Sequence, residues 1–114
     1  MRTEFLQFHR PSIDNDEIQE VIETLRSGWI TMGPRVKRFE VEFADYIGAS
    51  HAVAVNSGTA ALHIALAAIG LSEGDEVIVP TNTFTATAEV VIHFGGRPVM
   101  VDCRRDTFNL ENRP

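Results

Sequence analysis

One pattern occurs twice in this sequence: a short apolar run ends in a polar loop, and an apolar helical stretch follows the loop. The predicted strands span 52–55, 76–80 and 98–101, and the helical stretches span 60–69 and 86–94. Short apolar runs that alternate with helices are typical of strands buried on both faces of a parallel sheet. The sequence therefore predicts an α/β fold built on a mainly parallel sheet with flanking helices.

Two amphipathic helices are predicted ahead of this pattern. Asp14 and Glu17 have the spacing of a capping box, and apolar residues then recur at helical spacing until Gly28. Pro34 suits the first turn of a second helix, which we expect Gly48 to end. The sequence thus begins with a helical segment that precedes the α/β part.

The α/β part is predicted to be incomplete. We expect an N-terminal helical segment at 1–50 and an α/β domain at 51–114 that lacks later strands. The helical stretch at 60–69 is apolar almost all round, so it needs cover from more protein than this chain supplies. The segment 106–114 contains neither a capped helix nor a closing strand. We therefore expect the fold to continue beyond the sequence at hand.

Composition narrows the class of protein. The net charge is −6, with 16 acidic residues against 10 scattered basic ones, which argues against nucleic acid or an anionic membrane as partner. Cys103 is the only cysteine, so no internal disulfide forms and the reducing cytoplasm is the expected location. The four histidines have no metal-ligand spacing, and no metal site is expected.

The loop at 56–59 is the strongest local signal for a binding site. It reads Asn-Ser-Gly-Thr and lies between a predicted strand and a predicted helix. Free amide groups and the helix dipole favour an anion at such a helix start, with Gly58 allowing close approach and Thr59 adding a hydroxyl donor. The alternative is a tight turn in which Ser57 only caps the helix. The local pattern leaves both interpretations open.

Two aromatic residues are further candidates. Phe84 ends a polar loop at the carboxyl end of a predicted strand, where open parallel sheets bind ligands; it either stacks on a flat ring or folds into the core. Trp29 and Thr31 lie in an apolar loop bounded by glycines. They either line a pocket, or Trp29 fills the gap between the first two helices.

Five segments carry a resemblance to a known family. In order along the chain they are 26–34, 56–63, 74–80, 83–87 and 98–102. Together they closely resemble the N-terminal part of the DegT-like nucleotide-sugar aminotransferases, which depend on pyridoxal 5′-phosphate (PLP) and have the aspartate-aminotransferase type of fold. The similarity covers essentially the whole chain, and five motifs in the same order make it specific.

The resemblance assigns roles to the residues singled out above. It implies that the segment 58–60 holds the PLP phosphate and that Phe84 stacks on the pyridine ring. The cofactor-binding residues are then Gly58, Thr59, Ala60 and Phe84. Trp29 and Thr31 resemble a segment near the mouth of the family's active site, which implies substrate contact.

The resemblance also implies the reaction. An amino group, usually from glutamate, moves to a keto-sugar carried on a nucleotide, as in polysaccharide biosynthesis, in a cytoplasmic homodimer. The Schiff-base lysine lies downstream of the region represented here. The only lysine, Lys37, is predicted on a solvated helix face, so no catalytic residue is assigned within this chain. Two alternatives stay open: a deoxysugar dehydratase, in which histidine replaces that lysine, and a non-catalytic relative.

Overall fold

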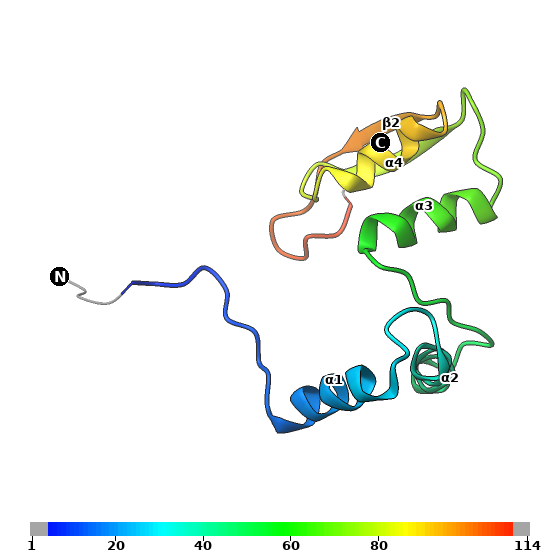
Figure 1. Cartoon of the computed structure of the whole chain (residues 1–114). Helices are drawn as coiled ribbons and strands as arrows, with labels where there is room; N and C mark the ends of the chain where they lie inside the picture. Colours follow the sequence, from blue (N-terminus) through cyan, green and yellow to red (C-terminus); the bar gives the residue numbers. More distant parts are fainter. Residues whose placement is uncertain (1–4, 111–114) are drawn as a thin grey trace. The chain divides into compact units, whose positions relative to one another are not determined.

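The computed structural model describes residues 5–110, which form four helices and two strands (Figure 1). The described chain forms two compact units that divide between Ala54 and Val55. The first unit contains α1 and α2, and the second contains α3, β1, α4 and β2 in that order. Their bounds are α1 Asn15–Ser27, α2 Pro34–Ile47, α3 Gly58–Ala68, β1 Glu76–Pro80, α4 Ala86–His93 and β2 Arg97–Val101.

The helix ends of the first unit follow the capping signals in the sequence. Asp14 accepts a hydrogen bond from the Asp16 amide at 3.0 Å, and Glu17 accepts one from the Asp14 amide at 2.8 Å. The bond from the Asp16 amide lowers the pKa of the Asp14 carboxyl, with a smaller contribution from Glu17. Gly28 and Gly48 end the two helices with left-handed backbone, at φ 75° and 71°. The predicted capping box and both glycine stops are confirmed.

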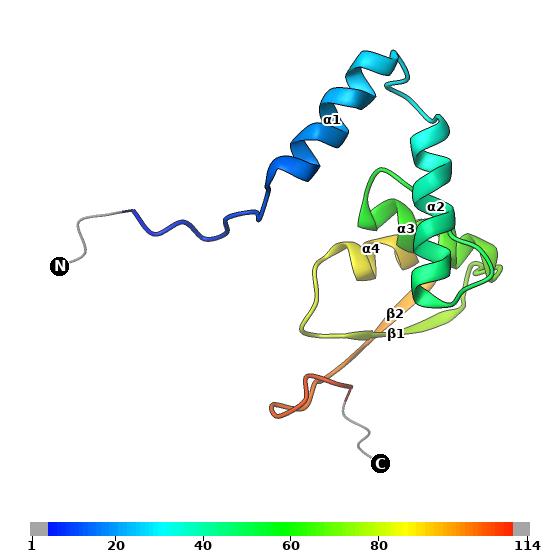
Figure 2. The same cartoon turned by 90° about the horizontal axis from the view of Figure 1, so that it is seen from below.

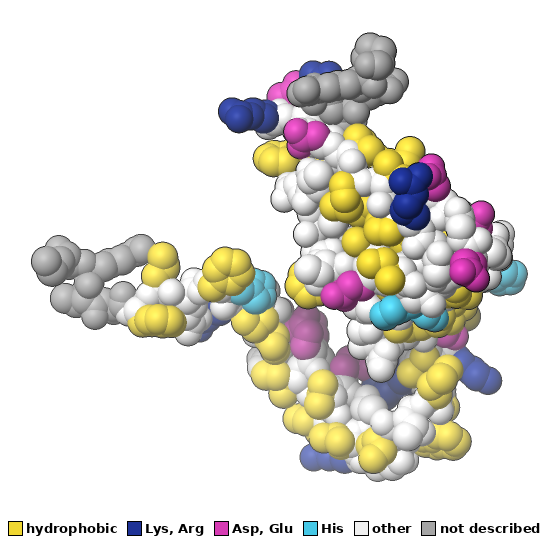
Figure 3. Space-filling view, turned by 90° about the horizontal axis from the view of Figure 1, so that it is seen from above, with side chains coloured by type: hydrophobic (Ala, Val, Ile, Leu, Met, Phe, Trp, Pro, Cys, Tyr) yellow, Lys and Arg dark blue, Asp and Glu magenta, His cyan; other side chains and the backbone are white. Residues whose placement is uncertain are grey.

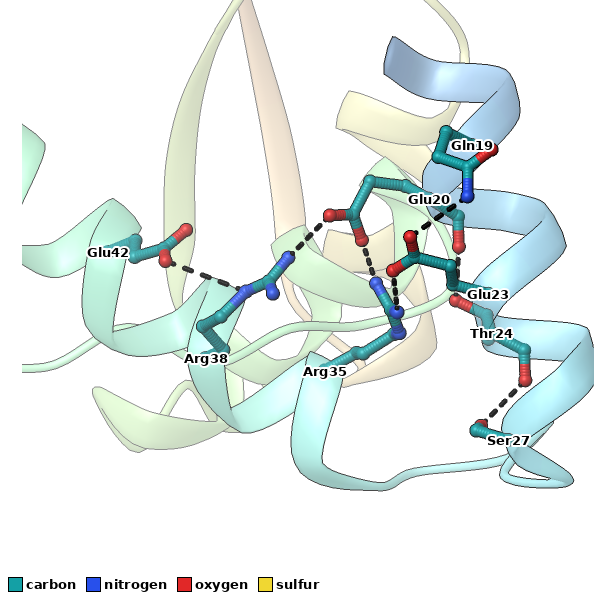
Figure 4. Close-up of polar contacts among 8 residues, drawn as sticks. All are labelled: Gln19, Glu20, Glu23, Thr24, Ser27, Arg35, Arg38 and Glu42. Carbon is teal, nitrogen blue, oxygen red and sulfur yellow. Dashed lines mark hydrogen bonds and ion pairs between the residues drawn. The ribbon is translucent and has the colours of Figure 1, made fainter.

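Exposed ion pairs connect α1 to α2 (Figure 4). Arg35 on α2 binds Glu20 and Glu23 on α1, and Arg38 binds Glu20 at 3.0 Å. Glu20 raises the pKa of the Arg38 guanidinium by hydrogen bonding to it. Ala44 is the only buried residue of either helix. The two helices are therefore joined mainly by charged groups at the surface.

The second unit contains a parallel sheet, as predicted, but with two strands where three were expected. β1 pairs with β2 in a register that runs from Glu76 opposite Arg97 to Pro80 opposite Val101. The connecting helix α4 lies against both strands (Figures 1 and 2). The residues that form the buried core here are Val79, Ala86, Val90 and Val91. This parallel β–α–β arrangement fixes the loop after β1 and the start of α4.

The predicted strand at 52–55 is not formed, which corrects the expectation from the sequence. These residues make no strand pairing, and Val53 is 72% exposed. A strand requires a neighbour for its backbone hydrogen bonds, and the described sheet contains only β1 and β2. Instead, the Ala54 amide donates to the Glu40 carboxylate at 2.9 Å. The apolar run at 52–55 was wrongly predicted as a strand, because it has no neighbouring strand among the described residues.

Helix α3 begins at Gly58, two residues before the predicted start. None of its residues is buried, although the sequence is apolar almost all round. Large apolar side chains such as Leu62 and Ile64 are exposed, and hydrophobic side chains are spread over the face drawn in Figure 3. The apolar surface of α3 is thus uncovered in this structure.

Within residues 5–110, no helix combines the length and apolar character needed to cross a bilayer.

Candidate functional site

The N-terminus of α3 is capped by one side chain and leaves two amides free. Ser57 Oγ accepts a hydrogen bond from the Ala60 amide at 3.1 Å, which confirms the predicted cap. The amides of Gly58 and Thr59 have no partner among the described residues. These amides and the Thr59 hydroxyl lie at the positive end of the helix dipole. The Ser57 cap therefore does not exclude an anion site here, because it leaves the Gly58 and Thr59 amides free.

Gly58 is not required by packing within this chain. A Cβ atom added at this position would meet nothing within 4 Å, and its backbone is not in the left-handed region. Neither conformation nor a neighbouring residue therefore accounts for glycine at the first position of α3. The open space above the main chain is what a ligand approaching the free amides needs. The residues present thus fit a phosphate group at this helix start.

The loop that carries Phe84 is tied to the sheet at its beginning. The Thr81 amide donates to the Val101 carbonyl at 3.0 Å, and Thr81 Oγ1 donates to the Asp102 carboxylate at 3.3 Å. The same carboxylate oxygen accepts from the Cys103 amide at 2.8 Å. These bonds join the carboxyl ends of β1 and β2, the edge at which parallel sheets bind ligands. Phe84 lies directly beyond this edge.

Phe84 does not enter the core. Its side chain is 78% exposed, so the core alternative considered from the sequence is wrong for this structure. It lines one open groove, of about 690 Å3, together with Thr59. The full set of lining residues is Gly58, Thr59, Ala61, Leu62, Ala65, Phe84, Ala86 and Thr87. Two candidates that are far apart in the sequence therefore come together in one site.

Packing of α3 against α4 forms this groove. The ring centroids of His63 on α3 and of Phe94 at the end of α4 lie 4.6 Å apart. This ring contact joins the two helices. Every residue that lines the groove is uncharged, although the chain as a whole is acidic. No carboxylate among the lining residues would therefore repel an anionic group at the start of α3. The groove combines a helix start that has free amides with an exposed aromatic ring.

Ala60 differs from the other predicted cofactor residues. It does not line the groove, and its amide is already bonded to Ser57 Oγ. Its role in holding a phosphate therefore stays a prediction. Gly58 and Thr59 are the two residues of the segment that present free donors to the groove.

The other predicted site residues lie in the first unit. Trp29 is 58% exposed and lines a pocket of about 320 Å3 that also includes Thr31. Thr24 and Ser27 line the same pocket, and their hydroxyl groups donate to the Glu20 and Thr24 carbonyls of α1. The structure thus brings Trp29 and Thr31 into one pocket, and their contact with a substrate stays a prediction.

Lys37 and Cys103 do not line the groove. Lys37 is exposed on α2, in the unit that does not contain the groove. Cys103 is free, and its backbone pairs with Leu110 in an isolated antiparallel bridge. Among the described residues, no three potential metal ligands come together.

Sequence reasoning missed the hydrogen bonds that hold the Phe84 loop. Thr83 Oγ1 and Thr87 Oγ1 lie 2.8 Å apart, and neither residue was singled out. Threonines four positions apart across a helix start were the available signal, because such positions face each other over one turn. The bond between Thr81 and Asp102 depends on the pairing of two strands, so no local pattern showed it.

Comparison with known proteins now decides the family. A sequence model described as the DegT/DnrJ/EryC1/StrS aminotransferase family matches residues 11–113. The chain belongs to this family. The resemblance stated from five motifs is thereby confirmed, and so is the fold expected from it.

Relatives in the DegT/DnrJ/EryC1/StrS family extend the comparison. The Bacillus subtilis spore coat polysaccharide biosynthesis protein SpsC is 53% identical over 110 residues, which are 96% of this chain and 28% of SpsC. Spr1654 from Streptococcus pneumoniae, assigned as a sugar aminotransferase and solved with PLP, has a TM-score of 0.85 and 46% identity, covering 93% of this chain and 27% of Spr1654.

A dehydratase also resembles this chain. The Escherichia coli GDP-4-keto-6-deoxy-D-mannose-3-dehydratase, solved with bound hydrated PLP, has a TM-score of 0.83 and 32% identity. The similarity covers 90% of this chain and 28% of the dehydratase. The chain thus spans little more than a quarter of the length of the family members that it matches.

Proposed function

We propose that the intact protein is a PLP-dependent aminotransferase that moves an amino group from glutamate to a nucleotide-linked keto-sugar. The observation that carries this proposal is the shared groove of Thr59 and Phe84. Its free amides, hydroxyl groups and exposed ring suit the phosphate and the flat ring of PLP. Membership of the aminotransferase family supports the same chemistry.

In this proposal the chain supplies positioning rather than acid–base groups. Gly58, Thr59 and the neighbouring Ala60 hold the cofactor phosphate at the start of α3, while Phe84 supports one face of the ring. When bound, PLP supplies an electron sink for the amino-transfer reaction. Lys37 is not assigned to it, because it lies on α2 among exposed residues. The group that carries the cofactor covalently belongs to the remaining part of the family fold.

Substrate contact is proposed for the pocket of the first unit. Trp29 offers a flat face to the sugar ring, and the Thr31 hydroxyl offers a hydrogen bond to a sugar hydroxyl. The name of SpsC supports a sugar intended for a polysaccharide. We further propose that the intact protein is a cytoplasmic homodimer. Light scattering on the purified protein tests the dimer, and cell fractionation tests the location.

A deoxysugar dehydratase is the second candidate, supported by the likeness to the E. coli enzyme. Identity is higher with Spr1654 than with the dehydratase, 46% against 32%, which favours the aminotransferase. The products distinguish the two candidates. An aminotransferase forms an amino sugar and 2-oxoglutarate from glutamate, whereas a dehydratase releases water from the sugar and leaves no nitrogen on it.

The phosphate site is tested by Thr59→Val, which removes the hydroxyl donor and keeps the volume. We expect PLP to bind the full-length protein about tenfold more weakly, since a hydrogen bond to a charged group contributes roughly 1.5–3 kcal/mol. Thr59→Ser is the matched control and is expected to retain the affinity. An unchanged dissociation constant for Thr59→Val in an equilibrium titration would exclude this hydroxyl from the phosphate site.

A further inference from the structure

We propose that the hydrogen bond between Thr83 and Thr87 is a positioning device that holds Phe84 ready for the cofactor ring. The inference rests on the proposed function, because it assumes that Phe84 stacks on PLP. It adds two residues to which neither the family motifs nor the sequence pattern assigned a role. Thr83 and Thr87 are positioning residues here, since they act through Phe84.

Phe84 needs such a device because its own side chain has little packing. With 78% of its surface exposed, the ring is not oriented by neighbouring core residues. Its backbone, in contrast, is held closely. The Thr83 and Thr87 hydroxyls lie 2.8 Å apart on either side of it, and the Phe84 carbonyl accepts from the Thr87 amide at 3.0 Å. The orientation of the ring therefore depends on the turn that carries it.

Both contacts join the turn that carries Phe84 to α4, the helix that supplies most of the buried core of the second unit. Thr87 is in the first turn of α4, next to Ala86, which is 5% exposed. Val90, one turn further along, is 1% exposed. Thr85, the N-cap residue of α4, makes no side-chain capping hydrogen bond, so the Thr83–Thr87 contact ties the loop to the helix instead. The loop is thus attached to a helix that is fixed against the sheet.

A loop held in its bound conformation raises affinity because less conformational entropy is lost when the ligand binds. Without the contact between the two threonines, Phe84 would sample more orientations, and fewer of them would present its face to the groove. The contact should therefore affect cofactor affinity without touching the cofactor. Thr83 allows a clean test, because it does not line the groove whereas Thr87 does.

The experiment measures PLP binding to variants of the full-length protein by equilibrium titration. Thr83→Val removes the contact at nearly constant volume, and Thr83→Ser restores a hydroxyl. Thr85→Val is the matched control, because Thr85 is in the same loop, makes no capping bond and does not line the groove. We expect Thr83→Val to weaken binding by about three- to tenfold, the loss typical of one neutral hydrogen bond. Thr83→Ser and Thr85→Val should stay near the unmodified protein.

A double-mutant cycle with Phe84→Ala then distinguishes positioning from general destabilisation. In the Phe84→Ala background, Thr83→Val should have no further effect on the dissociation constant. The circular dichroism band of bound PLP should also change in Thr83→Val at saturation, since it reports the surroundings of the ring. If Thr83→Val does not fold, Thr83→Ala takes its place with and without Phe84→Ala, because it removes the same hydroxyl at a residue that does not line the groove.

The outcomes separate this inference from the proposed function. No PLP binding by the unmodified protein would contradict the proposed function, and this inference with it. Suppose instead that PLP binds and that Phe84→Ala weakens this binding, but that Thr83→Val binds PLP as tightly as Thr85→Val does. Then only the positioning role is overturned. An undiminished effect of Thr83→Val in the Phe84→Ala background would likewise show that the threonine pair acts on the fold and not through Phe84.

Discussion

The two compact units of this chain are stabilised in different ways. In the second unit, α4 lies against a parallel pair of strands and buries Val79, Val90 and Val91 almost completely. In the first unit, α1 and α2 have one buried residue, Ala44, and are joined by exposed ion pairs. Exposed ion pairs contribute little to stability and are screened by salt. The second unit therefore has a small buried core around α4 and its strands, whereas the helices of the first unit have almost none.

The same contrast applies to the two candidate sites. The groove of Thr59 and Phe84 is built on a capped helix and on a loop tied to the sheet. The pocket of Trp29 and Thr31 is built on a loop between two loosely joined helices. The difference teaches that the proposed contacts to the cofactor phosphate and ring are attached to the core of the second unit, whereas the proposed substrate pocket lies between helices with almost no core.

The largest expected effect concerns the chain in isolation. Residues 1–114 alone should show no transamination, and they should not unfold cooperatively as a monomer. The first expectation follows from the absence of an assigned catalytic residue, and the second from the unpaired segment at 52–55 and the uncovered α3. Exposed apolar surface and unpaired backbone of this kind favour aggregation or association with a partner.

Thermal unfolding followed by circular dichroism, together with size-exclusion chromatography, tests the stability of the isolated chain. The full-length protein provides the comparison under the same conditions. A monodisperse monomer with a cooperative transition would contradict the claim about stability. Amino transfer that depends on added PLP would contradict the claim about catalysis.

The second prediction concerns the groove of Thr59 and Phe84. Phe84→Ala should weaken PLP binding to the full-length protein by about tenfold, because both ring stacking, about 0.5–1.5 kcal/mol, and apolar contact area are lost. Phe84→Tyr and Phe84→Trp keep a flat face and should retain binding and activity. An equal fall of the melting temperature with and without PLP would instead indicate that Phe84 has a purely structural role in the complete protein.

The smallest expected effect concerns the pocket of the first unit. Thr31→Val should raise the KM for the sugar substrate by about three- to tenfold, the loss typical of one hydrogen bond, and leave PLP affinity unchanged. Thr31→Ser should behave like the unmodified protein. Steady-state kinetics and a PLP titration on the same samples separate the two effects. If Thr31→Val weakened PLP binding and left the KM for the sugar unchanged, the proposed division of roles between the two units would be wrong.

The sequence predicted the elements that local signals control. The capping box at Asp14 and the stop at Gly28 are local, and the strands β1 and β2 each fall within one residue of their predicted bounds. The strand at 52–55 was wrong because strand formation depends on neighbours, which composition does not supply. For the site, the sequence indicated Thr59 and Phe84. It did not indicate the hydrogen bonds around them, since side-chain geometry arises only after α3 and α4 pack together.

The connection of β1 to β2 through α4 has a consequence for the order of folding events. The two strands are consecutive in the sequence, and a single crossover helix joins them, so their contacts have low contact order for a parallel pair. The entropy lost on closing this loop is correspondingly small. We therefore expect this β–α–β segment to be an early folding nucleus. In pulse-labelling hydrogen exchange its amides would be protected ahead of those in α1, with the turn that carries Phe84 already in place.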